Sequence, residues 1–196
     1  MKKNLMTAVL MTVATTILLG LVYPLLVTAI AQVVCPKQAN GQLIQKGGRL
    51  IGSTIIGQGF SGASYFHSRP SAAGNGYDAA NSAGSNLGPT NQKLIDRVQA
   101  DVAAAQAEHP GTPVPIDLVT TSASGFDPHI SPAAAEFQLA RIAKERGTTI
   151  DQIRPLLAKH TEPRQLGFLG EPRVNVLELN LELDERFPTN KQAQIQ

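Results

Sequence analysis

Three side chains in this sequence have types and spacing that could support catalysis or metal binding: His67, Asp127 and His129. The segment Asp127-Pro128-His129 places a carboxylate two residues from an imidazole, a combination that suits a general base or part of a metal site. A metal needs at least three converging ligands, however, and an aspartate before a proline also begins turns. A membrane-tethered enzyme that uses these residues and a simple turn are therefore both open.

Other catalytic signatures are missing from the sequence. It has no Gly-rich phosphate loop ending in Lys-Ser or Lys-Thr, no Gly-x-Ser-x-Gly elbow, no His-Glu-x-x-His zinc motif and no Asp-Lys-Thr-Gly phosphorylation loop. The single cysteine, Cys35, has no partner for an intrachain disulfide. We therefore predict no catalytic residue, no metal and no cofactor bound by this chain on its own.

Two loops carry side chains that could contact a ligand or a partner. Arg69 follows the aromatic pair Tyr65-Phe66 and could grip a carboxylate, stack on a partner, or tie its own loop. The loop Gly84-Ser85-Asn86-Leu87-Gly88 offers oxygens that could coordinate an alkali cation, because hard cations take oxygen ligands. The alternative is a loop pinned by its own hydrogen bonds.

Charge is divided along the chain. Lys and Arg total 17, with Lys2 and Lys3 before the apolar N-terminal stretch, and all 15 Asp and Glu residues follow that stretch. The part after it thus carries 15 basic and 15 acidic residues, since 17 − 2 = 15. Without clustered basic residues or any Trp, nucleic acid is excluded as a partner.

The elements that must position these residues begin with an uncharged stretch from Leu5 to Val34. It exceeds the ~20 residues that cross a bilayer, so we expect a transmembrane anchor over residues 1–34 and a soluble domain over residues 35–196. A secretion signal cleaved after Ala31, releasing a binding module, is the alternative. Lys2 and Lys3 favour an N-terminus inside the cytoplasmic (inner) membrane and a domain on its periplasmic or extracellular face.

Small side chains recur at every fourth position of this helix, at Ala8, Thr12, Thr16 and Gly20. Small residues let helices approach closely in lipid, so the stripe predicts packing against another membrane helix; a lipid-facing anchor is the alternative. Pro24 is expected to kink the helix or end its regular part.

Hydrophobic periodicity and capping signals predict a mixed helix-and-strand domain of the α+β class. Tyr65 and Phe66 are expected in an extended piece that buries an aromatic side chain, Pro155 is expected to bend its helix, and residues 71–91 form a loop. Leu177, Leu179, Leu181 and Leu183 alternate with polar residues, as in a strand with one buried face. The expected strands are 50–56, 116–120 and 174–183, and the expected helices are 91–108, 132–146 and 149–159.

Six motifs in order make the chain resemble the potassium-transporting ATPase C subunit (KdpC) family over nearly its whole length. They are Gly52-Ser53-Thr54-Ile55-Ile56-Gly57-Gln58-Gly59-Phe60, Tyr65-Phe66-His67-Ser68-Arg69-Pro70-Ser71, Gly84-Ser85-Asn86-Leu87-Gly88-Pro89-Thr90-Asn91, Pro113-Val114-Pro115-Ile116-Asp117-Leu118-Val119-Thr120, Ser124-Gly125-Phe126-Asp127-Pro128-His129-Ile130-Ser131-Pro132 and Leu169-Gly170-Glu171-Pro172-Arg173-Val174-Asn175-Val176-Leu177. Ala123, Phe126 and Pro155 depart from the family pattern, which affects local turn geometry.

The resemblance implies a non-catalytic accessory subunit of an ATP-driven, high-affinity potassium uptake complex. Its partners would be membrane lipid, a channel-like potassium-translocating subunit and a P-type ATPase subunit. It also implies a catalytic chaperone that raises the ATP affinity of the ATPase subunit, so ATP would bind only jointly with that subunit. The positions that the motifs mark as loop and interaction candidates are Tyr65, Phe66, Arg69, Ser85, Asn86, Asp127, His129, Arg173 and Asn175.

Overall fold

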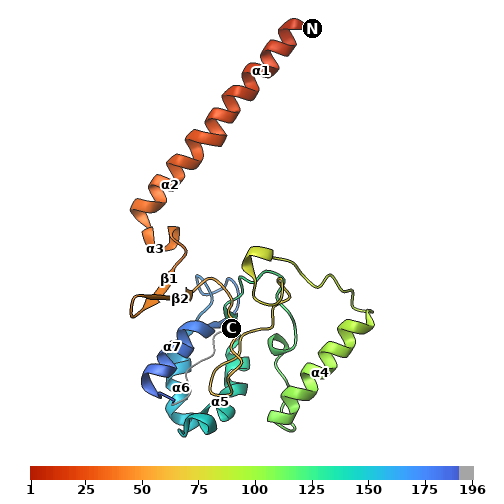
Figure 1. Ribbon diagram of the computed structural model, residues 1–196, viewed down its shortest axis with the longest axis vertical. Helices are drawn as coiled ribbons and strands as arrows, with labels where there is room; N and C mark the ends of the chain where they lie inside the picture. Colours follow the sequence, from red (N-terminus) through yellow and green to blue (C-terminus); the bar gives the residue numbers. More distant parts are fainter. Residues whose placement is uncertain (190–196) are drawn as a thin grey trace. The chain divides into compact units, whose positions relative to one another are not determined.

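The computed structural model describes residues 1–189 and divides the chain into two compact units. The first unit is Met1–Ser53 and the second is Thr54–Gln196. Figure 1 shows the long N-terminal helix of the first unit and the helices and loops of the second. Helices and strands both occur, which confirms the predicted mixed α+β class with an apolar N-terminal helix.

The N-terminal helix consists of α1 (Lys2–Ile17), a π-helical segment η1 (Leu18–Val22) and α2 (Tyr23–Val34). Together they form a 33-residue helix that is long and apolar enough to cross a membrane, and its most apolar part is not buried by any of residues 1–189. Pro24 lacks an N–H group, and its ring crowds the carbonyl four residues earlier, at Gly20 within η1. The expected interruption of regular α-helical geometry therefore lies just before this proline.

A short helix and a hairpin complete the first unit: α3 (Pro36–Ala39), β1 (Leu43–Lys46) and β2 (Arg49–Ser53). The two strands are antiparallel, and Lys46 pairs with Arg49 across the turn. The strand expected over residues 50–56 ends at Ser53, where the side-chain hydroxyl donates to the Gly41 carbonyl at 2.6 Å. The predicted boundary between the transmembrane anchor (residues 1–34) and the soluble domain (residues 35–196) stays a prediction.

The second unit is built on a small antiparallel sheet of order β3-β5-β4 beside three packed helices. Helices α5, α6 and α7 lie together in Figure 1. The elements of this unit are η2 (Ala79–Asn81), α4 (Gln92–Glu108), η3 (Ile116–Leu118), β3 (His129–Ile130), α5 (Pro132–Arg146), α6 (Ile150–Lys159), β4 (Thr161–Glu162), β5 (Arg173–Asn175) and α7 (Val176–Arg186).

The helix boundaries follow local capping chemistry, as predicted. The Ser131 hydroxyl caps α5 by accepting from the Ala134 N–H at 3.0 Å, and Gly147 ends that helix in the left-handed conformation at φ +64°. Asn91 caps α4 through the Lys93 N–H at 3.0 Å. Helix α6 runs through Pro155 without being split.

The strand predicted over residues 174–183 is wrong. Only Arg173–Asn175 is extended, and α7 begins at Val176. The Asn175 side chain caps this helix by accepting from the Glu178 N–H at 3.1 Å, and Leu and Glu are good helix formers. The buried positions Val176, Leu179, Asn180 and Leu183 have helical spacing, so the alternating leucines also satisfy a period of 3.6.

The strand predicted over residues 116–120 is also wrong. Pro115 precedes a 3₁₀ turn over Ile116–Leu118, closed by a hydrogen bond from the Leu118 N–H to the Pro115 carbonyl at 3.1 Å. The Asp117 side chain accepts from the Ser131 N–H at 2.6 Å. This side chain thus connects the turn to the start of α5, a contact that no local pattern encodes.

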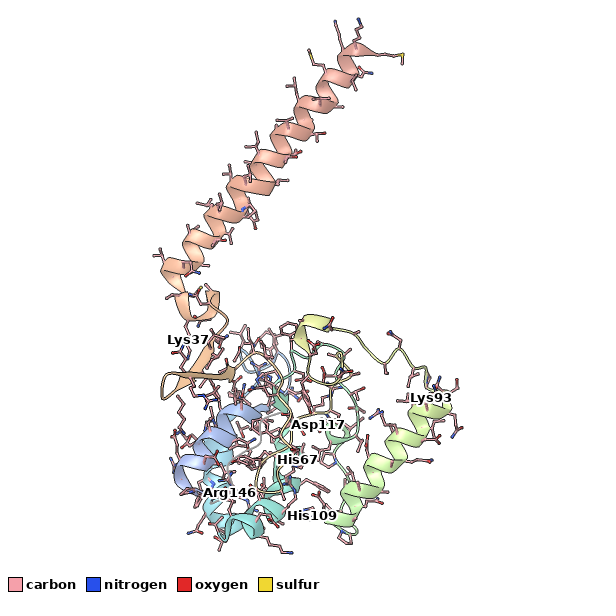
Figure 2. All side chains as sticks on the ribbon, in the orientation of Figure 1. Lys37, His67, Lys93, His109, Asp117 and Arg146 are labelled. Atoms are coloured by element: carbon pink, nitrogen blue, oxygen red, sulfur yellow. The ribbon has the colours of Figure 1, made fainter. Side chains whose placement is uncertain are left out.

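The core is centred on Phe66, which is fully buried as the sequence predicted. Its backbone N–H and carbonyl bond to the side-chain amide of Asn180, both at 2.9 Å. The next residue, His67, is held in the same way by the buried amide of Gln138 on α5, at 2.7 and 3.2 Å. The side-chain amides of two helices thus satisfy the backbone of residues 66 and 67, as a neighbouring strand would. His67 lies among packed side chains (Figure 2).

Candidate functional site

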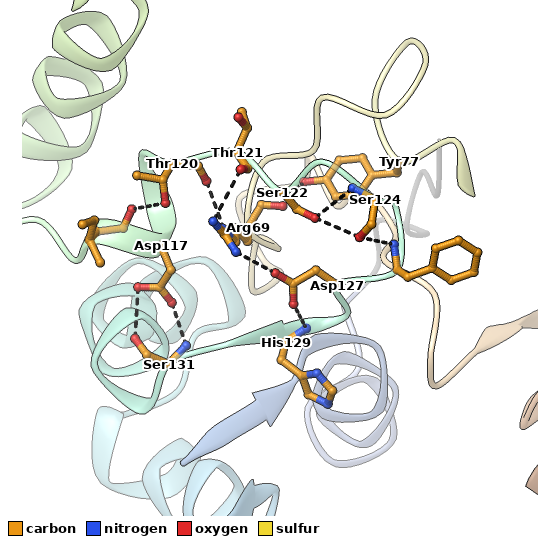
Figure 3. A network of polar contacts seen from close by, with 12 residues as sticks. Arg69, Tyr77, Asp117, Thr120, Thr121, Ser122, Ser124, Asp127, His129 and Ser131 are labelled. Atoms are coloured by element: carbon orange, nitrogen blue, oxygen red, sulfur yellow. Dashed lines mark hydrogen bonds and ion pairs between the residues drawn. The ribbon is translucent and has the colours of Figure 1, made fainter. Parts of the chain in front are cut away.

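Arg69 contacts three segments of the second unit, as Figure 3 shows. Its Nη1 lies 3.0 Å from Oδ2 of Asp127, its Nε donates to the Thr120 carbonyl at 3.2 Å, and its Nη2 donates to the Thr121 carbonyl at 3.4 Å. We call Arg69, Tyr77, Thr120, Thr121 and Asp127 the Arg69 network. It joins segments that lie more than 50 positions apart in the sequence.

Backbone contacts position the two halves of this network. The Ser122 N–H donates to the Pro70 carbonyl and the Ala72 N–H donates to the Ser122 carbonyl, both at 2.8 Å. The Gly57 N–H donates to the carbonyl of Gly125 at 2.8 Å, two residues before the acidic partner of Arg69. The loops over residues 69–72 and 120–127 are therefore fastened together along their backbones.

Tyr77 completes the network by donating from its hydroxyl to the Arg69 carbonyl at 3.0 Å. Burial, and secondly the negative charge of Asp127, raise the pKa of Tyr77 to about 12. The phenol therefore stays protonated at neutral pH and remains a hydrogen-bond donor.

A groove of about 410 Å³ lies beside the network. Its charged and polar walls include Arg69, Asp117, Asp127, His129 and Arg173, and prolines and Ile116 line much of the remainder. Two ion pairs lie in or at these walls, since Arg69 contacts Asp127 at 3.0 Å and Arg173 contacts Glu162 at 2.8 Å, and the Asp117 carboxylate accepts from the Ser131 N–H at 2.6 Å. An arrangement of already paired charges is typical of a structural site.

The imidazoles differ in their surroundings. Burial, followed by the positive charge of Arg173, lowers the pKa of His129 and so favours its neutral ring. The Asp127 carboxylate accepts from the backbone N–H of His129 at 3.4 Å, as in a turn. The ring of His67 instead contacts the Gly62 carbonyl at 3.1 Å, and burial lowers its pKa too.

The structure therefore brings Asp127 and His129 to one groove but places His67 outside its walls. Within residues 1–189, no group of three or more His, Cys, Asp and Glu side chains is arranged to hold a metal ion. The contacts described favour the turn interpretation of Asp127-Pro128-His129 over a catalytic one.

Three of the other motif residues serve the fold. The Tyr65 hydroxyl donates to Asp184 at 3.1 Å, and Phe66 is the core residue described above. Asn175 caps α7 and donates from Nδ2 to the Thr54 carbonyl at 2.7 Å. Their positions explain why these residue types are needed without invoking a ligand.

Ser85 and Asn86 lie in an exposed loop and do not line the groove. Asn86 has a φ of +53°, a backbone conformation that asparagine tolerates better than most residues. Coordination of an alkali cation by this loop stays a prediction. The same holds for helix packing through Ala8, Thr12, Thr16 and Gly20, which are all exposed on the N-terminal helix.

The sequence analysis did not identify the role of Tyr77 in the Arg69 network or the hydrogen bond from Ser131 to Asp117. Tyr77 is isolated among small residues in a segment that is poor in large apolar side chains. An isolated aromatic in such a loop is a usable signal, because a large ring gains most from burial. For Asp117 the sequence offered no local signal, because Ser131 lies 14 positions away.

Comparison with known proteins gives a consistent result. Residues 5–185 match the family model KdpC, described as K⁺-transporting ATPase, c chain. The chain is 68% identical over 188 residues to the potassium-transporting ATPase KdpC subunit of Koribacter versatilis, covering 96% of this chain and 97% of the relative. It is 57% identical over 190 residues to the subunit of the same name from Rhodospirillum rubrum, covering 96% and 98%.

Proposed function

Since the chain belongs to the KdpC family, the c chain of K⁺-transporting ATPases, we propose that it is a non-catalytic subunit that stabilises assembly of the potassium-transporting complex. The observation that carries this proposal is the apolar helix Lys2–Val34, whose most apolar part is not buried by any of residues 1–189. Its unpartnered surface offers a contact for the membrane helices of a channel-like subunit and a P-type ATPase subunit, with lipid around the remainder.

The second unit supports an assembly role in a different way. The donors of Arg69 go to Asp127 and to two backbone carbonyls. This guanidinium is thus employed in holding two loops together. Loops that are fixed in this way by an internally satisfied arginine are suited to presenting a rigid surface to a partner.

Deletion of residues 2–34 is expected to abolish co-purification of the chain with the other subunits of the complex. A finer test is Gly20→Leu, which places a large side chain in the stripe of small residues. This variant is expected to weaken co-purification, because the helix can no longer approach its partner closely. Leu19→Ile, at the neighbouring position outside the stripe, is the matched control. The measurement is the yield of partner subunits with a tagged chain from detergent-solubilised membranes; normal assembly of the deletion variant would contradict the proposal.

We also propose that the N-terminus lies inside and the second unit outside the cytoplasmic membrane. Cys35, the single cysteine, directly follows the helix and is partly accessible. A membrane-impermeant maleimide is expected to label it in intact cells. If Cys35 were labelled only after the cells are lysed, the opposite orientation would be correct.

This orientation constrains the proposed effect on ATP. A unit outside the membrane cannot contact cytoplasmic ATP, so any increase in the ATP affinity of the ATPase subunit must reach it through the membrane helix. ATP is then bound by the ATPase subunit, and this chain affects it only in the joint complex.

A further inference from the structure

The hairpin of β1 and β2 follows the N-terminal helix and α3 in the first unit, and its charge is entirely basic (Figure 1). The first unit contains no Asp or Glu, and the first acidic residue of the chain is Asp78. The basic residues that come after the helix in this unit are Lys37, Lys46 and Arg49. The hairpin and the segment before it therefore carry a positive potential that no acidic side chain of their own unit reduces.

The two basic residues of the hairpin lie directly opposite each other at its turn. Lys46 pairs with Arg49, and both side chains are exposed. Like charges directly opposite one another destabilise a pair of strands. Lys37 and Arg49 form no ion pair with any of residues 1–189. An anionic group outside the chain would reduce the repulsion at the turn, and Arg49 is available to bind it.

Two leucines of the hairpin are exposed beside these charges. Leu43 is 51% exposed and Leu50 is 60% exposed. Basic and apolar side chains on one exposed segment are typical of the surface of a membrane, because the basic groups reach the phosphates while the apolar groups enter the boundary of the acyl chains. The composition of the hairpin thus fits a phospholipid surface.

Contacts within the first unit hold the hairpin close to the last turn of the N-terminal helix. The side-chain amides of Gln32 in that turn and of Asn40 bond to each other at 3.1 and 3.3 Å. Leu43 lies three residues after Asn40, so the two Cα atoms are at most about 11 Å apart. The Ser53 hydroxyl donates to the Gly41 carbonyl at 2.6 Å and brings the other end of the hairpin to the same place. The base of the hairpin therefore lies near the level at which the helix ends.

We propose that the β1–β2 hairpin binds the headgroups of anionic phospholipids at the membrane surface where the N-terminal helix ends. This inference rests on the proposed membrane span of that helix and not on the assembly role. The headgroup layer on each side of a bilayer is about 5–8 Å thick, which is comparable to the distance from the helix end to the hairpin. Lipid phosphates are thus the anions closest to the hairpin, and its binding there fixes the depth and tilt of the helix.

A single fluorescent probe in the full-length chain tests the proposal. The chain has no Trp, so Leu50→Trp places the only indole on the hairpin. The purified chain is reconstituted into vesicles of phosphatidylcholine, with or without phosphatidylglycerol, whose acyl chains carry bromine as a quencher. We expect a blue-shifted, quenched emission in the vesicles with phosphatidylglycerol and a water-like emission in those without it.

Removing two positive charges next to the probe is expected to release the hairpin. Lys37→Gln with Arg49→Gln should lower the equilibrium constant for the bound hairpin about 25-fold, since about 1 kcal/mol for each basic residue near an anionic surface is a factor of about five. Lys93→Gln with Lys144→Gln is the matched control, because it removes the same charge from exposed positions of the second unit, and it is expected to keep the quenching. Arg49→Lys, which retains the charge, is expected to keep it too.

The outcomes separate this inference from the proposed function. A chain that incorporates into neither kind of vesicle would show that the proposed membrane span is wrong. Incorporation with a water-like emission in both kinds would overturn only the inference about the hairpin. Equal quenching with and without phosphatidylglycerol, or equal loss in the control variant, would overturn it as well. Quenching that is absent, with a blue shift that appears only when partner subunits are added, would assign the hairpin to an acidic protein surface instead.

Discussion

Replacing Arg146 with methionine is expected to lower the free energy of unfolding of the full-length chain by about 3–5 kcal/mol, because it removes the buried donor of three backbone carbonyls and of the partly exposed Asp184 carboxylate. The Arg146 side chain is fully buried, and its Nη2 lies 2.8 Å from Oδ1 of Asp184. Its guanidinium also lies 4.8 Å from the ring centroid of Tyr65. It further donates to three backbone carbonyls, those of Ser64, Leu183 and Phe187.

Chemical unfolding of the full-length chain in detergent measures this loss. Arg154→Met is the matched control, because its ion pairs with Glu136 and Asp151 lie at the surface and exposed pairs contribute about 0–1 kcal/mol. Similar losses for the two variants would show that Arg146 does not connect α5 to α7 as described. Arg146→Lys is expected to fall between wild type and methionine, since an ammonium cannot reproduce the planar fork.

Replacing Gly125 with alanine is expected to destabilise the chain by about 2–5 kcal/mol, the sum of a left-handed backbone cost and overpacking. Gly125 has a φ of +71°, and an added Cβ would lie 2.8 Å from the backbone nitrogen of Ala79 and 2.9 Å from its Cα. Its carbonyl accepts from Gly57 at 2.8 Å. The backbone that carries Asp127 to Arg69 must move to make room.

The matched control is Gly111→Ala. Gly111 has a similar φ of +77°, but an added Cβ would meet nothing within 4 Å. Only the backbone cost of about 1–2 kcal/mol then applies. Unfolding midpoints of both variants in denaturant separate the two contributions, and equal losses would remove steric crowding at Gly125 as a cause.

The sequence alone determined the features that depend on neighbouring residues. The N-terminal helix follows from a long uncharged stretch, and the ends of α5 follow from Ser131 and Gly147. The burial of Phe66 and the family also followed from local motifs, since each motif is a short run of consecutive residues. These features require no knowledge of which distant segments meet.

Tertiary structure decided the rest. The leucines over residues 177–183 fit both a strand and a helix, and the face packed into the core settled the matter in favour of α7. The partners of Arg69 and Arg146 lie 58 and 38 positions away, so no local pattern could assign them. The exposure of Leu166 could not be predicted for the same reason: a leucine in a sequence suggests the core, and only the fold shows that residues 1–189 leave this side chain exposed.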